Sequence, residues 1–271
     1  MLGRDVCSAA AAAHEVIALT REDLDITDAE AVDTALSAGR PDAVINCAAW
    51  TDVDGAEWRA EEAWAVNGRG AQNVATAAGA IGAWTVHIST DYVFDGRKRE
   101  PYLEADPVAP LSAYGRSKLA GERAVAQAAP GIHTIVRTSW LFGAGGPCFP
   151  KTILRLAQER AELTVVDDQL GCPTFTGHLA EALVALAADQ ALVGVLHVAA
   201  DGECTWHELA RSLIDAAAIR CEIHRGKAVE LGRPAPRPAY GVLRSERPSA
   251  PRLPHWRAGM AAFMAAGVPS P

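Results

Sequence analysis

A chain of 271 residues allows one large domain or two smaller ones, and 49% hydrophobic with 21% charged residues is the composition of a globular protein. The formal net charge of −8 excludes a general nucleic-acid binder, because phosphates require a cationic surface. No apolar run approaches the roughly 20 residues that a membrane span needs, so we expect neither a nucleic-acid nor a membrane partner.

Apolar segments and helix-forming segments alternate along the chain. In chain order we expect five helices, each followed by a strand. The helices span residues 3–13, 25–39, 61–82, 117–129 and 178–190. The strands that follow them span residues 15–19, 42–49, 84–90, 133–142 and 194–200. Thr27 or Asp28 is a candidate N-cap of the second helix, and Gly39 is its candidate C-cap. The alternation predicts an α/β fold with a doubly wound, Rossmann-like parallel sheet.

The pattern loosens from about Gly143, where loops rich in glycine and proline indicate a smaller C-terminal portion. The proline-rich stretch 233–256 could be a disordered tail, but its apolar residues favour docking on the rest of the molecule; these are Tyr240, Val242, Leu243 and Trp256. Ligands bind beyond the carboxyl ends of the strands in such sheets. The segments after strands 42–49, 84–90 and 133–142 are therefore predicted to form one wall of a site.

The six cysteines indicate a reducing compartment. They lie far apart, without Cys-x-x-Cys or zinc spacing, and the histidines show no metal spacing either. Buried reduced thiols favour a cytoplasmic protein, and no metal ligands can be assigned.

The stretch Tyr-Gly-Arg-Ser-Lys places Tyr114 and Lys118 four residues apart, so both side chains leave one face of the predicted helix. A nearby ammonium favours the phenolate, and we expect Lys118 to lower the pKa of Tyr114. The pair is a candidate general acid/base, although an isolated match is more often a surface tyrosine beside a solvated lysine. Ser89 and Thr90 end a buried strand, where a hydroxyl could bind a substrate carbonyl or simply satisfy backbone groups.

The motif HISTDYVFDG, followed at a fitting interval by PLSAYGRSKLAGE and RTSWLFG, resembles the extended short-chain dehydrogenase/reductase family. Within that family it is similar to the dTDP-4-dehydrorhamnose reductases, and matching segments run from LDITD to RPAYGVL. The resemblance implies reduction of the 4-keto group of dTDP-4-dehydro-L-rhamnose by hydride from NADPH or NADH. It also implies a dTDP-sugar as partner, a dinucleotide-binding domain over residues 1–142 and 176–199, and a nucleotide-sugar-binding domain over 143–175 and 200–271.

The resemblance assigns roles to individual residues. Tyr114 would protonate the C4 oxygen, Lys118 would hold the nicotinamide ribose, and Thr90 would hydrogen-bond the same oxygen. The residues implied to bind the cofactor are Gly3, Arg21, Asp25, Ile26, Ala48, Ala49, Asn67, Ser89, Tyr114 and Lys118. Those implied to bind the substrate are Thr51, Val53, Asp91, Tyr92, Trp140 and Phe149. Arg21 could meet a 2′-phosphate or be a solvated surface residue, and Trp140 could equally be core.

Three positions depart from the family pattern. Cys148 stands where an asparagine that contacts the nucleotide-sugar is usual, and a thiol cannot match the donors and acceptors of an amide. His178 replaces a common aspartate, and Trp50 replaces the usual tyrosine. Some members are associated with Mg²⁺ at a dimer contact, so Mg²⁺ and a homodimer are compatible with the resemblance, but no ligands can be identified.

The start of the chain carries a further expectation. The family begins with an apolar strand and a Gly-x-x-Gly-x-x-Gly loop, which lets the backbone approach the cofactor's pyrophosphate at a helix N-terminus. Gly3 corresponds to the third glycine, so we expect the strand and the first two glycines to be encoded upstream of Met1. In this topology that strand would lie between strands 15–19 and 42–49.

Two other functions stay open. Another nucleotide-sugar reductase or epimerase of the same fold would also account for the motifs, and Cys148 leaves room for it. A non-catalytic regulatory subunit is conceivable for a chain without the phosphate-binding loop. The retained Thr90, Tyr114 and Lys118 count against that function, because a scaffold has no use for an acid/base pair.

Overall fold

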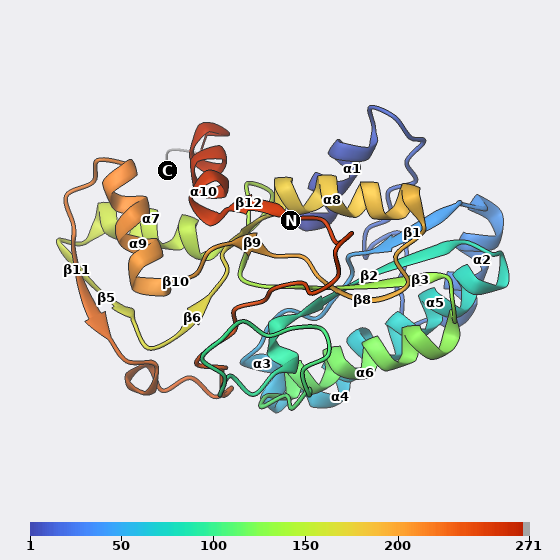
Figure 1. The fold of residues 1–271 in the computed structure, drawn as a ribbon, viewed down its shortest axis with the longest axis horizontal. Helices are drawn as coiled ribbons and strands as arrows, with labels where there is room; N and C mark the ends of the chain where they lie inside the picture. The colour runs from blue at the N-terminus through green and yellow to red at the C-terminus, as the bar shows by residue number, and fades with distance from the viewer. Residues whose placement is uncertain (268–271) are drawn as a thin grey trace.

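A four-stranded parallel sheet in the order β1-β2-β3-β8 forms the centre of the computed structural model, which describes residues 1–267 (Figure 1). Its strands are β1 (Ala43–Asn46), β2 (Trp84–Thr90), β3 (His133–Thr138) and β8 (Gly194–His197). Every residue of β2 and β3 is buried, as expected for central strands covered on both faces. The predicted α/β fold with a doubly wound parallel sheet is confirmed.

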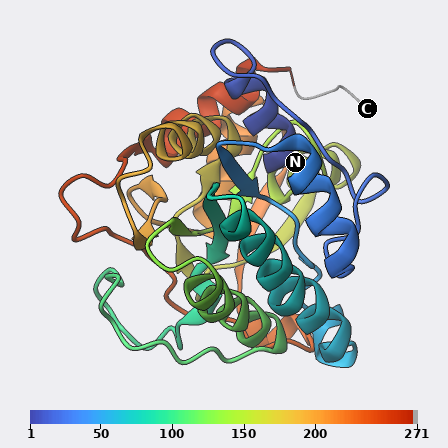
Figure 2. The ribbon, with the colours of Figure 1, turned by 90° about the vertical axis from the view of Figure 1, so that its right-hand side faces the viewer.

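Helices cover both faces of this sheet. Helices α1 (Leu2–Ala10) and α8 (Thr176–Asp189) lie together on one face, and α5 (Ala71–Ala80) and α6 (Ala113–Ala128) lie side by side on the other, with α2 (Ala29–Gly39) next to α5 (Figures 1 and 2). Leu183 of α8 packs with Val86 and Leu196 of the sheet, and all three are completely buried. Val125 of α6 packs with Ile135 on the opposite face.

A smaller portion follows the sheet and appears on the left of Figure 1. Its helices are α7 (Phe149–Glu159), α9 (Trp206–Ala216) and α10 (Trp256–Ala265). Its strand pairs are β5 (Glu162–Val166) with β11 (Glu222–Gly226), β6 (Leu170–Gly171) with β10 (Cys204–Thr205), β4 (Leu141–Phe142) with β7 (Thr174–Phe175), and β9 (Ala200–Asp201) with β12 (Leu253–His255). The sequence predicted none of these helices, nor β5 and β11, because glycine and proline in the connecting loops masked short periodic segments.

Residues 15–19 correct one prediction, because they form no strand. Val16, Ile17 and Leu19 are 38, 58 and 49% exposed. An isolated apolar segment becomes a strand only where a neighbour satisfies its backbone groups. Strand β1 lies at the sheet edge and pairs with β2 alone among the described residues, so the segment 15–19 stays irregular on the surface.

Other element boundaries refine the predictions. Asp28 is the N-cap of α2 and accepts from the amides of Glu30 and Ala31, while the left-handed C-cap is Arg40 rather than Gly39. The predicted helix 61–82 is divided into α4 (Ala60–Trp64), a π-helical turn η1 (Ala65–Gly70) and α5. The predicted strand 133–142 is interrupted at Trp140, whose φ is 48°.

The proline-rich stretch docks on the molecule, as its apolar residues predicted. Tyr240, Val242, Leu243 and Trp256 are all less than one-tenth exposed. Tyr240, Val242 and Leu243 share a core cluster with Phe94 and Tyr102. Residues 233–256, the C-terminal arm, are therefore anchored beside the end of β2. The remaining short elements are α3 (Gly55–Trp58), η2 (Asp91–Val93) and η3 (Ala228–Leu231).

Candidate active site

Helix α6 is set unusually close to its neighbours at two glycines. Ser112 caps the helix and accepts from the Gly115 amide at 3.1 Å. A Cβ on Gly115 would lie 2.3 Å from the Tyr92 carbonyl oxygen, and a Cβ on Gly121 would lie 2.1 Å from the Asn67 carbonyl oxygen. Only glycine permits this approach, which places the first turns of α6 beside the carboxyl end of β2.

Lys118 reaches from α6 to the backbone of β2. It is 3% exposed, and its Nζ donates to the Ile88 carbonyl oxygen at 2.6 Å. Burial lowers the pKa of Lys118 to about 8, and the negative charge of Glu122 opposes this shift. An ammonium has three N–H donors. The single bond to Ile88 therefore leaves this buried cation with capacity to hold hydroxyl groups of a ligand.

Tyr114 lies one turn before Lys118 and faces the end of β2. Its ring meets that of Tyr92 edge to face, with centroids 5.5 Å apart. Burial raises the pKa of Tyr114 above its ordinary value, and a hydrogen bond with Thr90 opposes this effect. The expectation that the pKa of Tyr114 is lowered is therefore wrong in its net direction, because it neglected burial. The phenol stays protonated at neutral pH and can act as an acid.

Asp91 is a buried carboxyl next to these hydroxyls. It is 2% exposed and accepts from the Thr90 hydroxyl at 3.1 Å, while the Tyr92 amide donates to the same hydroxyl at 3.2 Å. Burial raises the pKa of Asp91 to about 7. Thr90, Asp91, Tyr92 and Tyr114 thus form one contiguous group, as the sequence predicted for the end of this strand.

Arg237 connects this group to the C-terminal arm. Its guanidinium donates to both carboxylate oxygens of Asp54, at 3.0 and 2.8 Å, and its positive charge opposes the rise that burial causes in the pKa of Tyr92. The predicted substrate residues Thr51 and Val53 belong to the same loop as Asp54, where Thr51 is exposed and Val53 half-buried. Arg237 was missed by the sequence analysis, since nothing local to it indicates a partner so distant in the chain.

Three aromatic rings lie against one another beyond the carboxyl end of β3. Trp140 stacks on Trp206 with centroids 3.5 Å apart and planes 5° from parallel, and Phe149 lies 4.6 Å from Trp206. A Cβ on Gly171 would come within 2.4 Å of the Trp140 ring. The structure thus joins the predicted residues Trp140 and Phe149 through Trp206, which the sequence did not single out. Cys148 contacts the Gly143 carbonyl oxygen at 3.6 Å, and His178 packs against Phe175.

The predicted cofactor residues other than Ser89, Tyr114 and Lys118 divide into two groups. Gly3 lies in the first turn of α1 and faces Cys47, directly after β1, since its Cβ would be 3.5 Å from that of Cys47. Ala48 and Ala49 continue from there, and the Asn67 side chain holds this loop by binding both backbone groups of Trp50. Through these two bonds Asn67 holds the loop after β1 in place.

The second group lies on the surface. Arg21 and Asp25 are exposed, and Asp25 accepts from the backbone and hydroxyl of Thr27. Ile26 is half-buried against Gly70, where a Cβ would come within 2.7 Å. No contact among the described residues joins Arg21 or Asp25 to the residues around Tyr114.

Two kinds of feature are absent from residues 1–267. No helix there is both long and apolar enough to cross a membrane. The same residues contain no group of three or more His, Cys, Asp or Glu side chains placed to hold a metal ion, so the expectation of Mg²⁺ gains no support.

Comparison with known proteins gives consistent matches over most of the chain. The family model of the RmlD substrate binding domain matches residues 1–268. A dTDP-4-dehydrorhamnose reductase from Streptomyces griseus is 45% identical over 255 residues, covering 90% of this chain and 83% of its own. A dTDP-4-keto-6-deoxy-D-glucose reductase from Streptomyces niveus is 47% identical over 212 residues, covering 78% and 73%. The crystal structure of dTDP-4-dehydrorhamnose reductase from Bacillus anthracis in complex with NADP superposes with a TM-score of 0.95 at 36% identity, covering 98% and 95%.

Proposed function

The chain belongs to the RmlD substrate binding domain family, and we propose that it reduces the 4-keto group of dTDP-4-dehydro-L-rhamnose with NADPH to give dTDP-L-rhamnose. The observation that carries the proposal is the meeting of Thr90, Tyr114 and Lys118 at the carboxyl end of β2. This group combines a protonated phenol, a hydroxyl and a buried cation, which is what reduction of a carbonyl requires from a protein.

The residues present fit a nicotinamide dinucleotide. The first turn of α1 faces the loop after β1, and a helix N-terminus favours phosphate groups. Lys118 keeps unused donors for ribose hydroxyls. Thr138, the register partner of Thr90, has a buried hydroxyl without a hydrogen-bond partner in the described structure, as a ligand-facing group would. When bound, the cofactor supplies the hydride.

Tyr114 and Thr90 would handle the oxygen. As the substrate carbon gains a C–H bond and its C=O π bond breaks, the developing alkoxide takes the proton from the Tyr114 hydroxyl. The Thr90 hydroxyl would donate a hydrogen bond to the same oxygen, after exchanging its present bond to Asp91. Lys118 would stabilise the resulting phenolate until it regains a proton from solvent. The neutral phenol in the protein alone is the correct starting state for this step.

Loss of NADPH absorbance on addition of dTDP-4-dehydro-L-rhamnose tests the proposal. We expect turnover by the wild-type chain and a loss of about 10²- to 10⁴-fold in kcat for Tyr114→Phe, because only the proton donor is removed. Glu159→Gln is a matched control on an exposed face of α7 and should retain full activity. Absence of turnover by a folded chain that binds NADPH would refute the proposal.

A second substrate is favoured by two observations. The Streptomyces niveus relative is named for reduction of dTDP-4-keto-6-deoxy-D-glucose, and Cys148 lies at the start of α7 where its side chain contacts backbone rather than offering an amide. We therefore include dTDP-4-keto-6-deoxy-D-glucose and a UDP-linked keto-sugar in the same assay. A higher kcat/KM for either one would replace dTDP-4-dehydro-L-rhamnose as the substrate.

A further inference from the structure

A buried ion pair lies beneath the candidate active site. Glu122 of α6 and Arg137 of β3 are each 4% exposed. The Arg137 Nε and one terminal nitrogen donate to the two carboxylate oxygens of Glu122 at 2.8 and 2.7 Å, and the Ser89 hydroxyl donates to the same carboxylate at 2.5 Å. Burying two charges is unfavourable before their mutual attraction is counted. Such a pair is therefore poor evidence of stability alone and suggests a further role.

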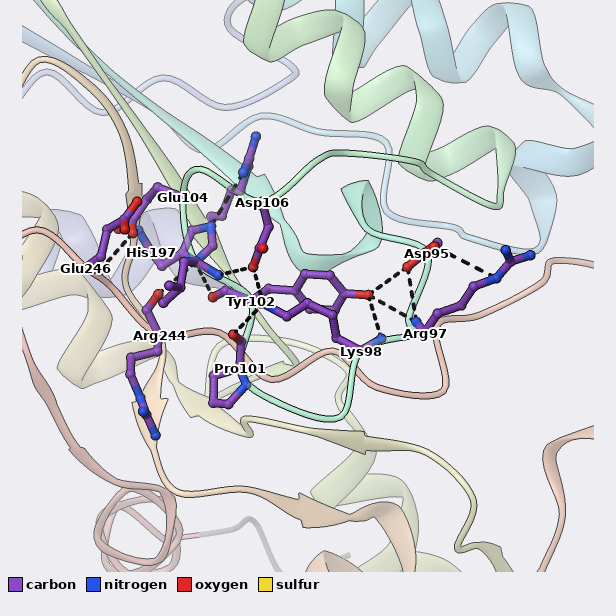
Figure 3. Close-up of polar contacts among 12 residues, drawn as sticks. Asp95, Arg97, Lys98, Pro101, Tyr102, Glu104, Asp106, His197, Arg244 and Glu246 are labelled. Atoms are coloured by element: carbon purple, nitrogen blue, oxygen red, sulfur yellow. Dashed lines mark hydrogen bonds and ion pairs between the residues drawn. The ribbon is translucent and has the colours of Figure 1, made fainter.

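The pair is held from its far side by a second set of contacts. The other terminal nitrogen of Arg137 lies 3.5 Å from His197 Nε2, and the guanidinium stacks over the Phe94 ring at 5.1 Å. His197 Nδ1 donates to the carbonyl oxygens of Tyr102 and Arg244, at 2.9 and 3.1 Å (Figure 3). Nε2 is therefore free to accept from Arg137. Burial lowers the pKa of His197, which keeps it neutral.

The near side of the pair points to Lys118. Glu122 follows Lys118 by one turn on α6, and the Ser89 hydroxyl that binds Glu122 comes directly after the Ile88 carbonyl that binds Lys118. Glu122 and Lys118 are thus tied to two adjacent residues of β2. Both are locked relative to each other by hydrogen bonds rather than by packing alone.

The other groups that face Lys118 carry no negative charge at neutral pH. Burial raises the pKa of the Cys47 thiol to about 12, so this group after β1 stays neutral. His87 faces Lys118 from β2, and burial lowers its pKa well below the ordinary range. Arg137 on β3 is a cation and lies beyond the Glu122 carboxylate. Among these groups Glu122 is thus the one carboxylate, and its negative charge raises the pKa of Lys118 against the effect of burial.

We propose that Glu122 is a positioning residue for Lys118: its carboxylate, fixed by Arg137 and Ser89, keeps the buried ammonium charged and directed at the end of β2. The consequence for turnover rests on the proposed reductase activity, whereas the electrostatic coupling does not. Without the carboxylate, Lys118 would lose its proton at a lower pH and could no longer stabilise a phenolate or hold hydroxyl groups as a cation.

Direct titration of Lys118 by NMR tests the coupling. The chain contains only four lysines, at 98, 118, 151 and 227, so protein labelled with ¹³C at the lysine Cε gives few signals, and Lys118→Met identifies the one of interest. Glu122→Gln should lower the pKa of Lys118 by about 1 to 3 pH units. Glu122→Asp keeps the negative charge, so the pKa of Lys118 in this variant should stay close to its wild-type value. Glu159→Gln removes an equal charge from an exposed ion pair on α7 and should leave Lys118 unchanged.

A second variant covers the case in which Glu122→Gln fails to fold with an unpaired buried Arg137. Glu122→Gln/Arg137→Gln removes both charges and keeps a neutral hydrogen-bonded pair. Lys118 should lose its proton at lower pH in this variant as well. The alkaline limb of the kcat profile should move to lower pH by the same amount. An unchanged Lys118 titration in both variants would overturn the proposal. A shifted titration in a chain without reductase activity would uphold the coupling and refute the proposed function instead.

Discussion

Replacing Asp91 with asparagine should stabilise the protein at alkaline pH and have little effect at acidic pH. Burial raises the pKa of Asp91 from 3.8 in the unfolded chain to about 7 in the native state. Between these values the native state holds a proton that the unfolded chain has lost, so the free energy of unfolding falls as pH rises through this range. Above pH 7 the native state carries the full cost of a buried carboxylate.

The size of this cost follows from the two pKa values. At about 1.4 kcal/mol for each pH unit, the difference between 3.8 and about 7 corresponds to about 4 kcal/mol. That is a large share of the ~5–15 kcal/mol by which domains are usually stable. Asparagine is uncharged and nearly isosteric, and its amide oxygen can still accept from the Thr90 hydroxyl. The substitution therefore removes the charge with little change in packing.

Urea unfolding at a series of pH values from about 5 to about 9 measures the effect. The stability advantage of Asp91→Asn over the wild type should grow up to about pH 7 and then stay constant. Asp95→Asn, in the following loop, is a control that should lower the free energy of unfolding. The Tyr102 hydroxyl lowers the pKa of Asp95 and stabilises its charged form, which the substitution removes. A stability difference between Asp91→Asn and wild type that does not vary with pH would refute the reasoning.

Two glycines give further tests of the close approaches around the site. Gly121→Ala should lower the free energy of unfolding by roughly 1–3 kcal/mol, since its Cβ would lie 2.1 Å from the Asn67 carbonyl oxygen; a variant with the wild-type urea midpoint would contradict this. Gly171→Ala should displace the Trp140 ring, which its Cβ would approach to 2.4 Å, and change the tryptophan fluorescence spectrum and raise KM for the sugar nucleotide. An unaltered spectrum would show that the ring stays in place.

The centre of the sheet was predictable because its signals are local. The buried run 84–90 forms β2 with the predicted bounds, and the Asp28 cap of α2 can be identified from neighbouring residues alone. The segment 15–19 is also apolar and forms no strand. Whether an apolar segment pairs depends on a neighbour elsewhere in the chain, and a local pattern contains no information about that neighbour.

The candidate site was predictable to the extent that it lies on one motif. Tyr114 and Lys118 were identified from their spacing and Thr90 from its place at the end of a strand. Arg237, Arg137 and Trp206 come from distant segments and carry no local pattern. The direction in which the pKa of Tyr114 shifts also could not be predicted from the sequence. Spacing shows which charge is near, whereas the depth of burial that outweighs it is a property of the folded molecule.

The phenol of Tyr114, the ammonium of Lys118 and the carboxylate of Glu122 lie on one face of α6. Tyr114, Lys118 and Glu122 follow one another at intervals of four residues on α6, which corresponds to a rise of about 6 Å each. Their spacing is therefore set by helix geometry and does not depend on the loops that surround a substrate. Lys118 precedes Glu122, the less favourable order for an exposed helical pair, so their arrangement is explained better by the contacts with β2 and β3 than by helix stability. Helix α6 would thus preserve the distances on which the proposed proton transfer depends.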